Sequence, residues 1–287
     1  MNALGCDVSH WQGEIDFARM KEAGANFVFL KASQAEWTDR RFVVNYQAAK
    51  QAGLLVGMYH YLDWTTPADK QARYFAKLIQ DYPPDIEPVL DYEERRKAPL
   101  QRIAIVAARE FVDIVEENTG RVCMVYTSPG YWHEYGSDAA SWAECPLWIA
   151  HYRVSKPIVP APWKDWLFWQ YTDRGDGKQY GVSSAQIDLN WYNGTVDELL
   201  ARYGRPSPEE QNGEPARRAP VMLRAVSRVN IRSGPSTSHA PLGILSSGER
   251  IEVIGIKVES AQRVWIRHER GWSAMVYDGL ILMQEVS

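Results

Sequence analysis

Residues 88–94 read Pro-Val-Leu-Asp-Tyr-Glu-Glu, an apolar run that ends in acidic side chains. On an extended strand, the side chains at positions i and i+2 point to the same face. We therefore expect Asp91 and Glu93 to project together, with side-chain roots roughly 6–7 Å apart. Cleavage of a glycosidic bond requires such a pair, in which one carboxyl group is protonated and the other is ionised. The competing interpretation is two ordinary surface acids on a loop that follows a strand.

Outward from this stretch, short apolar or aromatic runs alternate with helical patterns through residues 1–204. The runs predict strands at 4–8, 27–31, 54–61, 87–93, 121–126, 146–152, 166–171 and 186–191. Helical periodicity covers residues 16–23, 39–52, 68–80, 101–117 and 196–203. This alternation is typical of an α/β protein, here an irregular (β/α) TIM-like barrel whose last third is poor in helices.

Polar side chains gather near the C-terminal ends of the predicted strands. They are Asp7, Lys31, His60, Asp91, Glu93, Tyr126, His151, Gln170, Asp188 and Asn190. In barrel enzymes this end of the strands carries the chemistry. The sequence therefore predicts an active site at the barrel mouth.

Two further acids are expected to flank the central pair. Asp7 closes the first predicted strand and Asp188 closes the last, and these strands are neighbours in a closed barrel. Clustered carboxylates raise the pKa of at least one member, which is how a glutamic acid stays protonated near neutral pH. We favour substrate binding and electrostatic support for Asp7 and Asp188 over direct proton transfer; a structural role in anchoring loops is the alternative.

Aromatic residues are abundant, with 12 Trp and 15 Tyr against seven Phe. Trp and Tyr combine a flat apolar face with a polar tip, which suits a groove for an amino-sugar polymer. Some of them must instead fill the barrel core. The candidates for substrate binding or electrostatic support beside the acids are Tyr61, Tyr126, Trp169, Gln170 and Asn190.

Composition disfavours several other classes of protein. The 287-residue chain has a net charge of −4 and lacks the dense basic stripe of a nucleic-acid-binding protein. Cys6, Cys123 and Cys145 have no disulfide or zinc spacing. A metal-dependent hydrolase or deacetylase, with His60, His151, Asp7 and Asp188 as ligands, is a rival hypothesis, but no metal-binding motif supports it. We expect no cofactor, no metal and a monomer.

The N-terminal residues show no basic segment followed by an apolar stretch, and no apolar run is long enough to cross a membrane. We therefore expect a protein made in the cytoplasm without a signal peptide. A secreted form whose leader has been removed is the alternative.

Residues 205–219 are polar and rich in Pro, a composition typical of a linker. Short strands are then expected at 221–226, 229–232, 250–256, 264–268 and 271–276, which implies a small β barrel. The predicted division is a catalytic barrel at 1–204, a linker at 205–219 and a second domain at 220–287.

Separate segments of the barrel resemble glycoside hydrolase family 25, the Chalaropsis-type lysozymes. They are residues 5–13 (Gly-Cys-Asp-Val-Ser-His-Trp-Gln-Gly), 27–32, 57–61, 90–93 (Leu-Asp-Tyr-Glu), and 169–171 with 187–190. The resemblance implies cleavage of the β-1,4 bond between N-acetylmuramic acid and N-acetylglucosamine. It places the family's Asp-X-Glu at Asp91 and Glu93, and its first-strand and last-strand Asp at Asp7 and Asp188.

The tail resembles bacterial Src-homology-3-like wall-binding modules, through residues 230–236 (Asn-Ile-Arg-Ser-Gly-Pro-Ser) and the Gly271–Trp272 pair. Together the two resemblances imply a phage endolysin-like enzyme whose partner is bacterial peptidoglycan.

The sequence thus predicts a muramidase in which Glu93 is the general acid and then the base. Asp91 either attacks the anomeric carbon or orients the 2-acetamido group of the substrate, and close carboxylates favour retention of configuration. The alternatives are a catalytically inactive glycan-binding protein and a chitin-cleaving glycosidase.

Overall fold

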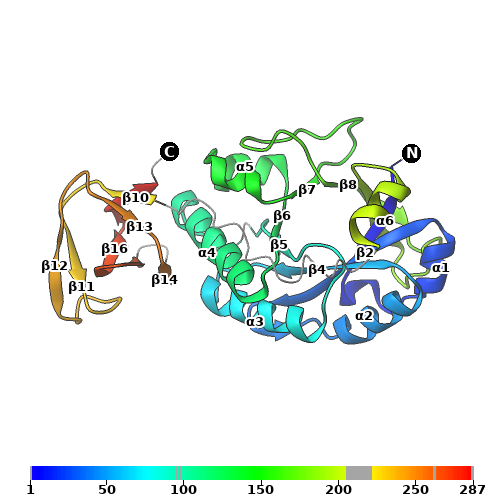
Figure 1. The fold of residues 1–287 in the computed structure, drawn as a ribbon, viewed down its shortest axis with the longest axis horizontal. Coiled ribbons are helices and arrows are strands. Elements are labelled where there is room, and N and C mark those ends of the chain that lie inside the picture. Colours follow the sequence, from blue (N-terminus) through cyan, green and yellow to red (C-terminus); the bar gives the residue numbers. More distant parts are fainter. Residues whose placement is uncertain (1, 95, 97, 205–221, 261–262, 286–287) are drawn as a thin grey trace.

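The first body of the molecule is a closed barrel (Figure 1). The computed structural model describes residues 2–94, 96, 98–204, 222–260 and 263–285. The ring of the barrel comprises β1 (Leu4–Val8), β2 (Ala25–Gln34), β4 (Leu55–Tyr61), β5 (Val89–Asp91), β6 (Met124–Thr127), β7 (Leu147–Ala150), β8 (Phe168–Asp176) and β9 (Gln186–Tyr192). Pairing of β1 with both β2 and β9 closes it, and β3 (Trp37–Thr38) extends β2 beyond the ring. The predicted α/β barrel is confirmed.

Helices cover the outside of the barrel, and all the described ones except α6 precede β7 in the chain. They are α1 (Phe17–Glu22), α2 (Phe42–Gln51), α3 (Ala68–Asp81), α4 (Gln101–Thr119), α5 (Pro129–Tyr135) and α6 (Val196–Tyr203), with short 3-10 turns at His10–Gln12 and Ala140–Glu144. Periodicity predicted all of them except α5 and the two turns. The segment of α5 is short and aromatic, and its helix begins because Ser128 caps the backbone N–H of Tyr131 and Pro129 occupies the first turn.

The last two strands depart from the expected parallel arrangement. The connection between β8 and β9, residues 177–185, is too short for a crossover helix, so the two strands form an antiparallel hairpin. As a result β9 also runs antiparallel to β1. Asp188 was predicted at the C-terminal end of its strand. It instead lies near the start of β9, and only the reversed direction brings it opposite Asp7.

The barrel interior is filled by aromatic and aliphatic side chains that alternate with outward-facing ones. On β5, Val89 belongs to the inner cluster, whereas Leu90 and Tyr92 pack in the outer cluster beneath the helices. Inside, the rings of Phe29 and Trp148 stack with centroids 4.1 Å apart. Gly57 makes room for this packing, since a Cβ there would lie 2.2 Å from the Phe29 ring. The interior is therefore a packed core, and only the mouth is available to a ligand.

A second, β-rich body follows residue 221. Its strands are β10 (Met222–Ala225), β11 (Val229–Arg232), β12 (Pro241–Leu245), β13 (Arg250–Glu252), β14 (Gly255–Ser260), β15 (Arg263–His268), β16 (Gly271–Tyr277), β17 (Leu280–Ile281) and β18 (Met283–Glu285). They form two sheets, β13-β10-β18 and β12-β11-β16-β15-β14, with β17 on β16. The predicted strand 250–256 is in fact two strands, and β12, β17 and β18 were not predicted because they are short or mostly exposed. The predicted linker lies outside the described residues.

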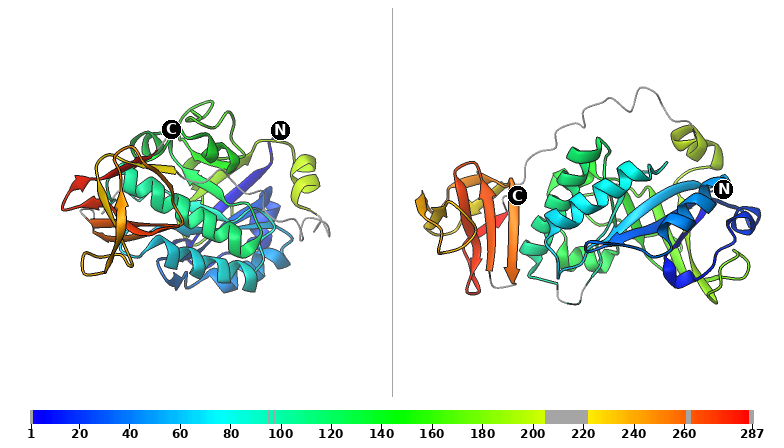
Figure 2. Two further views of the ribbon diagram at one scale, coloured as in Figure 1. Left: turned by 60° about the vertical axis from the view of Figure 1, so that its left-hand side comes forward. Right: turned by 90° about the horizontal axis from the view of Figure 1, so that it is seen from below.

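The two bodies touch where β14 lies against α3 and α4 (Figures 1 and 2). In this contact Glu110 of α4 is buried, and its Oε1 accepts a hydrogen bond of 2.6 Å from the backbone N–H of Ile256. Burial raises the pKa of Glu110 to about 8, with Asp69 and Asp113 adding to the rise and Arg73 and the Ile256 hydrogen bond opposing it. The contact is therefore built around a carboxyl group that favours its neutral form.

We expect this contact to weaken as the pH rises. The pKa of Glu110 is raised from 4.5 to about 8, so its neutral form stabilises the docked state fully below about pH 4.5. That stabilisation falls progressively as the pH rises to about 8, because the buried group must then ionise. Small-angle X-ray scattering between pH 5 and pH 10 measures whether the two bodies stay docked, and hydrogen exchange of the Ile256 N–H measures whether its hydrogen bond to Glu110 persists. The Glu110→Gln variant, neutral at every pH, should remain docked; equal pH dependence in both proteins would contradict the assignment.

Candidate active site

The acids of residues 88–94 lie at the mouth of the barrel. Asp91 follows the inward-facing Val89 on β5 and is itself buried. The strand ends at Asp91, two residues earlier than predicted, so Glu93 lies just beyond it and is exposed. Glu93 nevertheless lies near Tyr126 of β6 and Asp7 of β1, since both of these residues influence its pKa. The structure thus brings Asp91, Glu93 and Asp7 together.

Asp7 is the most thoroughly hydrogen-bonded of these acids. Its Oδ2 accepts from Gln170 Nε2 at 2.8 Å and from Asn190 Nδ2 at 2.7 Å. Further hydrogen bonds orient both amides. Asn190 Oδ1 accepts from Trp148 Nε1 at 2.8 Å. Gln170 Oε1 accepts from the hydroxyl of Tyr126 at 2.8 Å. The amides predicted to bind substrate therefore direct hydrogen bonds to Asp7, which fixes their orientation and stabilises its carboxylate form.

Asp7 and Asp188 form a carboxyl–carboxylate pair. They face each other across β1 and β9, and a hydrogen bond between their side chains lowers the pKa of Asp7 and raises that of Asp188. Burial is the largest influence on both groups, and their pKa values lie at about 6 for Asp7 and about 8 for Asp188. The two carboxyl groups therefore disfavour carrying two negative charges at the same time.

The central pair likewise disfavours carrying two negative charges, so that one group can be protonated while the other is ionised. Although Glu93 is open to solvent at the mouth, the protein atoms around its carboxyl group partly desolvate it. This desolvation, then Asp7 and Glu94, raises the pKa of Glu93 to about 7. Burial and the charge of Glu93 raise the pKa of Asp91 well above its usual range. The buried Oδ1 atom of Asp91 has no hydrogen-bond partner among the residues that the structure describes. Such an atom, turned into a polar site, is available to a ligand.

A buried cation sits beside these carboxyl groups. Lys31, at the mouth end of β2, is buried and donates to Gln34 Oε1 at 2.8 Å, with its ammonium 4.6 Å from the ring centroid of Tyr61. Burial lowers the pKa of Lys31, while Asp91 and then Asp39 oppose that shift. Sequence reasoning placed Lys31 at a strand end but gave it no role. The available signal was a lysine closing the apolar run Phe27–Leu30.

Not every predicted residue reaches the cluster. Trp169 lies on the opposite face of β8 from Gln170; it packs in the outer cluster and donates to the backbone oxygen of His151. The Tyr61 hydroxyl donates to Glu94 Oε2 at 2.8 Å, so Tyr61 borders the site and covers Lys31. Tyr152 does reach the cluster, because its hydroxyl donates to Gln170 Oε1 at 2.5 Å.

The histidines of the rival metal hypothesis are not brought together. Both ring nitrogens of His60 are engaged inside the protein, Nδ1 with Ser33 Oγ at 2.8 Å and Nε2 with Gln71 Oε1 at 2.9 Å. His151 Nδ1 accepts from the backbone N–H of Ile158 at 3.1 Å. Within the described ranges, no group of three or more His, Cys, Asp or Glu side chains has the arrangement of a metal site.

Exposed aromatic rings border the mouth on the side of β1 and β2. Trp11 follows β1 and is 74% exposed, with its ring 4.6 Å from that of His10. His10 Nδ1 lies 2.5 Å from Asp39 Oδ2, which holds the histidine in place. Trp37 of β3 is 43% exposed, and the Lys31 ammonium lies 5.7 Å from its ring centroid. Exposed and positioned indole faces are suited to stacking on sugar rings.

Comparison with known proteins decides the class of this site. Residues 6–180 match the family described as glycosyl hydrolases family 25. The chain belongs to glycosyl hydrolase family 25. It is 33% identical over 208 residues to lysozyme M1 of Streptomyces globisporus, covering 69% of this chain and 70% of that one. It is 30% identical over 210 residues to an N,O-diacetylmuramidase of a Chalaropsis species, covering 68% of this chain and 96% of that one.

Solved structures agree with this membership. The bacterial lysozyme from Streptomyces coelicolor superposes with a TM-score of 0.63 at 31% identity, over 71% of this chain and 97% of that one. Residues 227–273 match the bacterial SH3 domain. This family-25 member is therefore a glycoside hydrolase of the lysozyme class joined to an SH3 domain. No helix in the described part of the chain is both long and apolar enough to cross a bilayer.

Proposed function

We propose that this family-25 enzyme is an N-acetylmuramidase that cleaves the β-1,4 bond between N-acetylmuramic acid and N-acetylglucosamine, with Glu93 and Asp91 as its catalytic residues. The observation that carries the proposal is the cluster of carboxyl groups at the barrel mouth. Glu93 is exposed there with a pKa raised to about 7, beside the buried Asp91. An accessible acid that is protonated near neutral pH can donate to a leaving oxygen.

In the proposed mechanism, Glu93 protonates the glycosidic oxygen as the bond to the anomeric carbon breaks. Asp91, in its ionised form, either attacks that carbon or orients the substrate's 2-acetamido group to attack it. Glu93 then removes a proton from the water that resolves the intermediate. Two displacements at one carbon retain its configuration, as in other glycosidases with adjacent carboxylates.

The neighbouring groups support the charge changes of this reaction. Lys31 interacts with both catalytic carboxyl groups and lowers their pKa values, so it favours the ionised form of Asp91. Asp7 lies close enough to raise the pKa of Glu93, and Gln170 and Asn190 orient it. We assign Asp7 and Asp188 to electrostatic support and substrate binding rather than direct proton transfer.

We also propose that residues 1–204 are the catalytic domain, residues 205–219 a linker, and residues 220–287 the domain that holds the enzyme on the wall. The match of residues 227–273 to bacterial SH3 domains supports this division. In this proposal the protein acts as a monomer on peptidoglycan, in the manner of a phage endolysin.

Product analysis tests the proposed bond specificity. Purified peptidoglycan and chitin are digested side by side, reducing ends are counted, and released fragments are identified by mass spectrometry. A muramidase releases fragments that end in reducing N-acetylmuramic acid. Release from chitin alone would favour the chitin-cleaving alternative, and wall binding without new reducing ends would favour an inactive glycan-binding protein.

Activity is expected to fall as the pH rises through about 7, because Glu93 must carry its proton to act as the acid. Replacing Lys31 with Met removes a positive charge that lowers the pKa values of Glu93 and Asp91. In the Lys31→Met variant, the acid limb of the pH profile, where Asp91 ionises, and the alkaline limb, where Glu93 loses its proton, should therefore both move to higher pH. The measurement is kcat/KM on soluble glycan strands from pH 4 to pH 9, with thermal unfolding as a check on folding. An alkaline limb that stays at the same pH or moves to lower pH would contradict the assigned influence of Lys31 on Glu93.

A further inference from the structure

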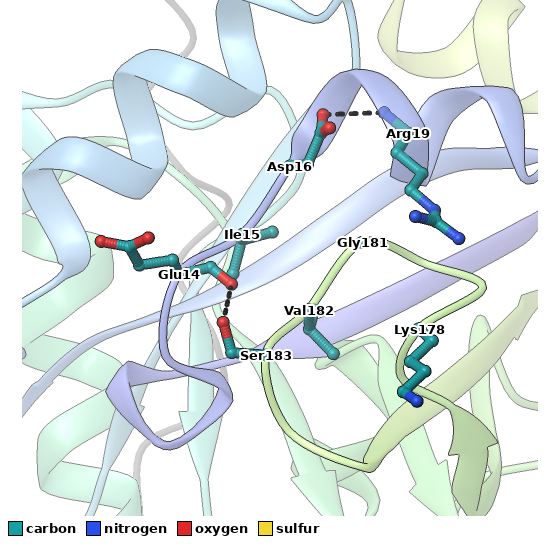
Figure 3. A pocket seen from close by; sticks show the side chains of 8 residues that line it. All are labelled: Glu14, Ile15, Asp16, Arg19, Lys178, Gly181, Val182 and Ser183. Atoms are coloured by element: carbon teal, nitrogen blue, oxygen red, sulfur yellow. Dashed lines mark hydrogen bonds between the residues drawn. The ribbon is translucent and has the colours of Figure 1, made fainter.

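The loop after β1 and the β8–β9 hairpin enclose a hollow of about 450 Å³ (Figure 3). Its lining sets Glu14 and Asp16 against Arg19 and Lys178, so its charges balance. The hollow therefore favours neither an anion nor a cation. Buried and directed hydrogen bonds are found instead on the two residues that flank Glu93 in the chain.

Glu93, the proposed general acid, lies beyond the pairings of β5 with β4 and β6, which end at Asp91. A residue past a strand end is ordinarily less restrained than one within the ladder. The preceding residue is nevertheless anchored. The N–H of Tyr92 donates to the backbone oxygen of Tyr126 at 2.9 Å, and the Tyr92 hydroxyl donates to the backbone oxygen of Tyr135 at 2.8 Å.

Glu94, the following residue, is held by three separate segments. Its backbone oxygen accepts from Trp64 Nε1 at 2.8 Å and from the hydroxyl of Tyr131 at 3.1 Å. Its side chain is only 13% exposed, and Oε2 accepts from the hydroxyl of Tyr61 at 2.8 Å. These donors belong to β4, to the connection between β4 and α3, and to α5. Segments that precede and follow β5 in the chain thus meet at this one residue.

The two donors to the backbone oxygen of Glu94 pack against the same ring. The rings of Trp64 and Tyr131 contact the buried ring of Tyr92 edge-on, with centroids 6.1 Å and 4.9 Å away. A carbonyl oxygen has two lone pairs, and two donors fixed by packing restrict its direction. Because neighbouring Cα atoms are about 3.8 Å apart, fixing residues 92 and 94 also restricts the backbone of Glu93 between them.

We propose that Glu94 is a positioning residue, whose anchored backbone oxygen and Tyr61-bound carboxylate hold the carboxyl group of Glu93 at the glycosidic oxygen. The inference rests on the proposed function, since it requires Glu93 to be the general acid. Such an acid must lie within hydrogen-bond reach of the oxygen that it protonates, and a misplacement of about 1 Å can cost about 10²-fold in rate. Glu94 acts through its neighbour and requires no contact with the substrate.

The charge of Glu94 provides a second, separable effect. After desolvation and Asp7, it is the next influence that raises the pKa of Glu93. Besides Glu94 and Tyr61, the titratable groups that interact with Glu93 are Asp7, Lys31, Asp91, Tyr126, Tyr152 and Asp188. All six are retained in the variants below, so a shift in the pH profile reports the charge at residue 94.

The test separates the side chain of Glu94 from its backbone anchors. Glu94→Ala removes the acceptor of the Tyr61 hydroxyl, whereas Glu94→Gln keeps an acceptor and removes only the charge. The double variant Trp64→Phe/Tyr131→Phe removes both donors to the backbone oxygen and keeps the charge. The matched control is Tyr46→Phe on the outer helix α2, which removes a hydroxyl that donates to another backbone oxygen at 2.8 Å.

The measurements are kcat and KM on soluble glycan strands from pH 4 to pH 9, with thermal unfolding as a check on folding. Glu94→Ala and the double variant should each lower kcat by about tenfold or more and leave KM within about twofold, because they loosen the acid and not the groove. Glu94→Gln should restore most of the kcat lost in Glu94→Ala. Its alkaline limb should move to lower pH, since a charge that raises the pKa of Glu93 is gone. The double variant should keep its alkaline limb in place, and Tyr46→Phe should match the unaltered enzyme.

A kcat within about twofold of the unaltered value in both Glu94→Ala and the double variant would overturn the positioning role. A raised KM with unchanged kcat would overturn it as well, because Glu94 would then bind substrate. Glu94→Ala alters no buried ring, so it tests the role even if the ring replacements impair folding. Failure of the proposed function is distinguishable: an active Glu93→Gln variant would remove the general acid itself, whereas an inactive one beside fully active Glu94 variants would refute only the positioning.

Discussion

Replacing Glu93 with Gln is expected to lower turbidity clearing of purified walls by about 10²–10⁴-fold, the usual contribution of a general acid–base group. Gln preserves the size of the side chain but cannot donate a proton to the glycosidic oxygen or take one from water. The SH3 domain, which we propose holds the enzyme on the wall, is untouched, so binding of the variant to walls should equal that of the unaltered protein. The measurements are initial clearing rates and a wall sedimentation assay.

The control for this variant is Glu117→Gln, which removes an exposed carboxylate on α4, outside the barrel mouth. It should clear walls at the unaltered rate. If Glu93→Gln retained more than about a tenth of the activity, Glu93 would not be the general acid.

Replacing Asp91 with Asn is expected to reduce kcat/KM by about 10²–10³-fold, because it removes the negative charge that faces the developing positive charge of the transition state. Asn is nearly isosteric with Asp. The replacement also removes the repulsion between the Asp91 and Glu93 carboxylates, which helps to raise the pKa of Asp91. Folding should therefore be retained or improved. Thermal unfolding and soluble-strand kinetics measure both effects.

The surface variant Asp81→Asn is the matched control, since Asp81 makes only an exposed ion pair with Lys77 at 3.6 Å. The stereochemistry of the unaltered enzyme completes the test. NMR of the first product should show the β-anomer before mutarotation, as retention requires. Release of the α-anomer would exclude both the covalent and the acetamido-assisted roles of Asp91.

The central pair could be predicted from local sequence because strand alternation is a short-range property. Val89 and Asp91 share the inner face of β5 while Leu90 and Tyr92 face outward, as a period of two requires. Glu93 lies past the strand end but is still directed toward Asp7 and Tyr126. The exact end of β5 could not be predicted, since it depends on pairing with β4 and β6.

The roles of the surrounding polar residues depended on contacts between distant segments. Gln170 and Asn190 were predicted beside the acids, but only the folded barrel shows that both donate to Asp7. Trp169 was predicted in the groove from its neighbours in sequence, yet its side chain lies on the outer face of β8. Strand alternation indicates that the adjacent Trp169 and Gln170 face opposite sides of β8, but which of the two faces the mouth depends on how the ring closes.

The sequence by itself determined most of the strand and helix pattern, the shared face of Val89 and Asp91 on β5, and the family resemblance. These follow from periodicity and from motifs within a few residues. The tertiary structure alone decided the reversal of β9 and the placement of Asp188 opposite Asp7. The physical reason is that a short hairpin connection forces β9 to run antiparallel, and both of these features depend on that direction.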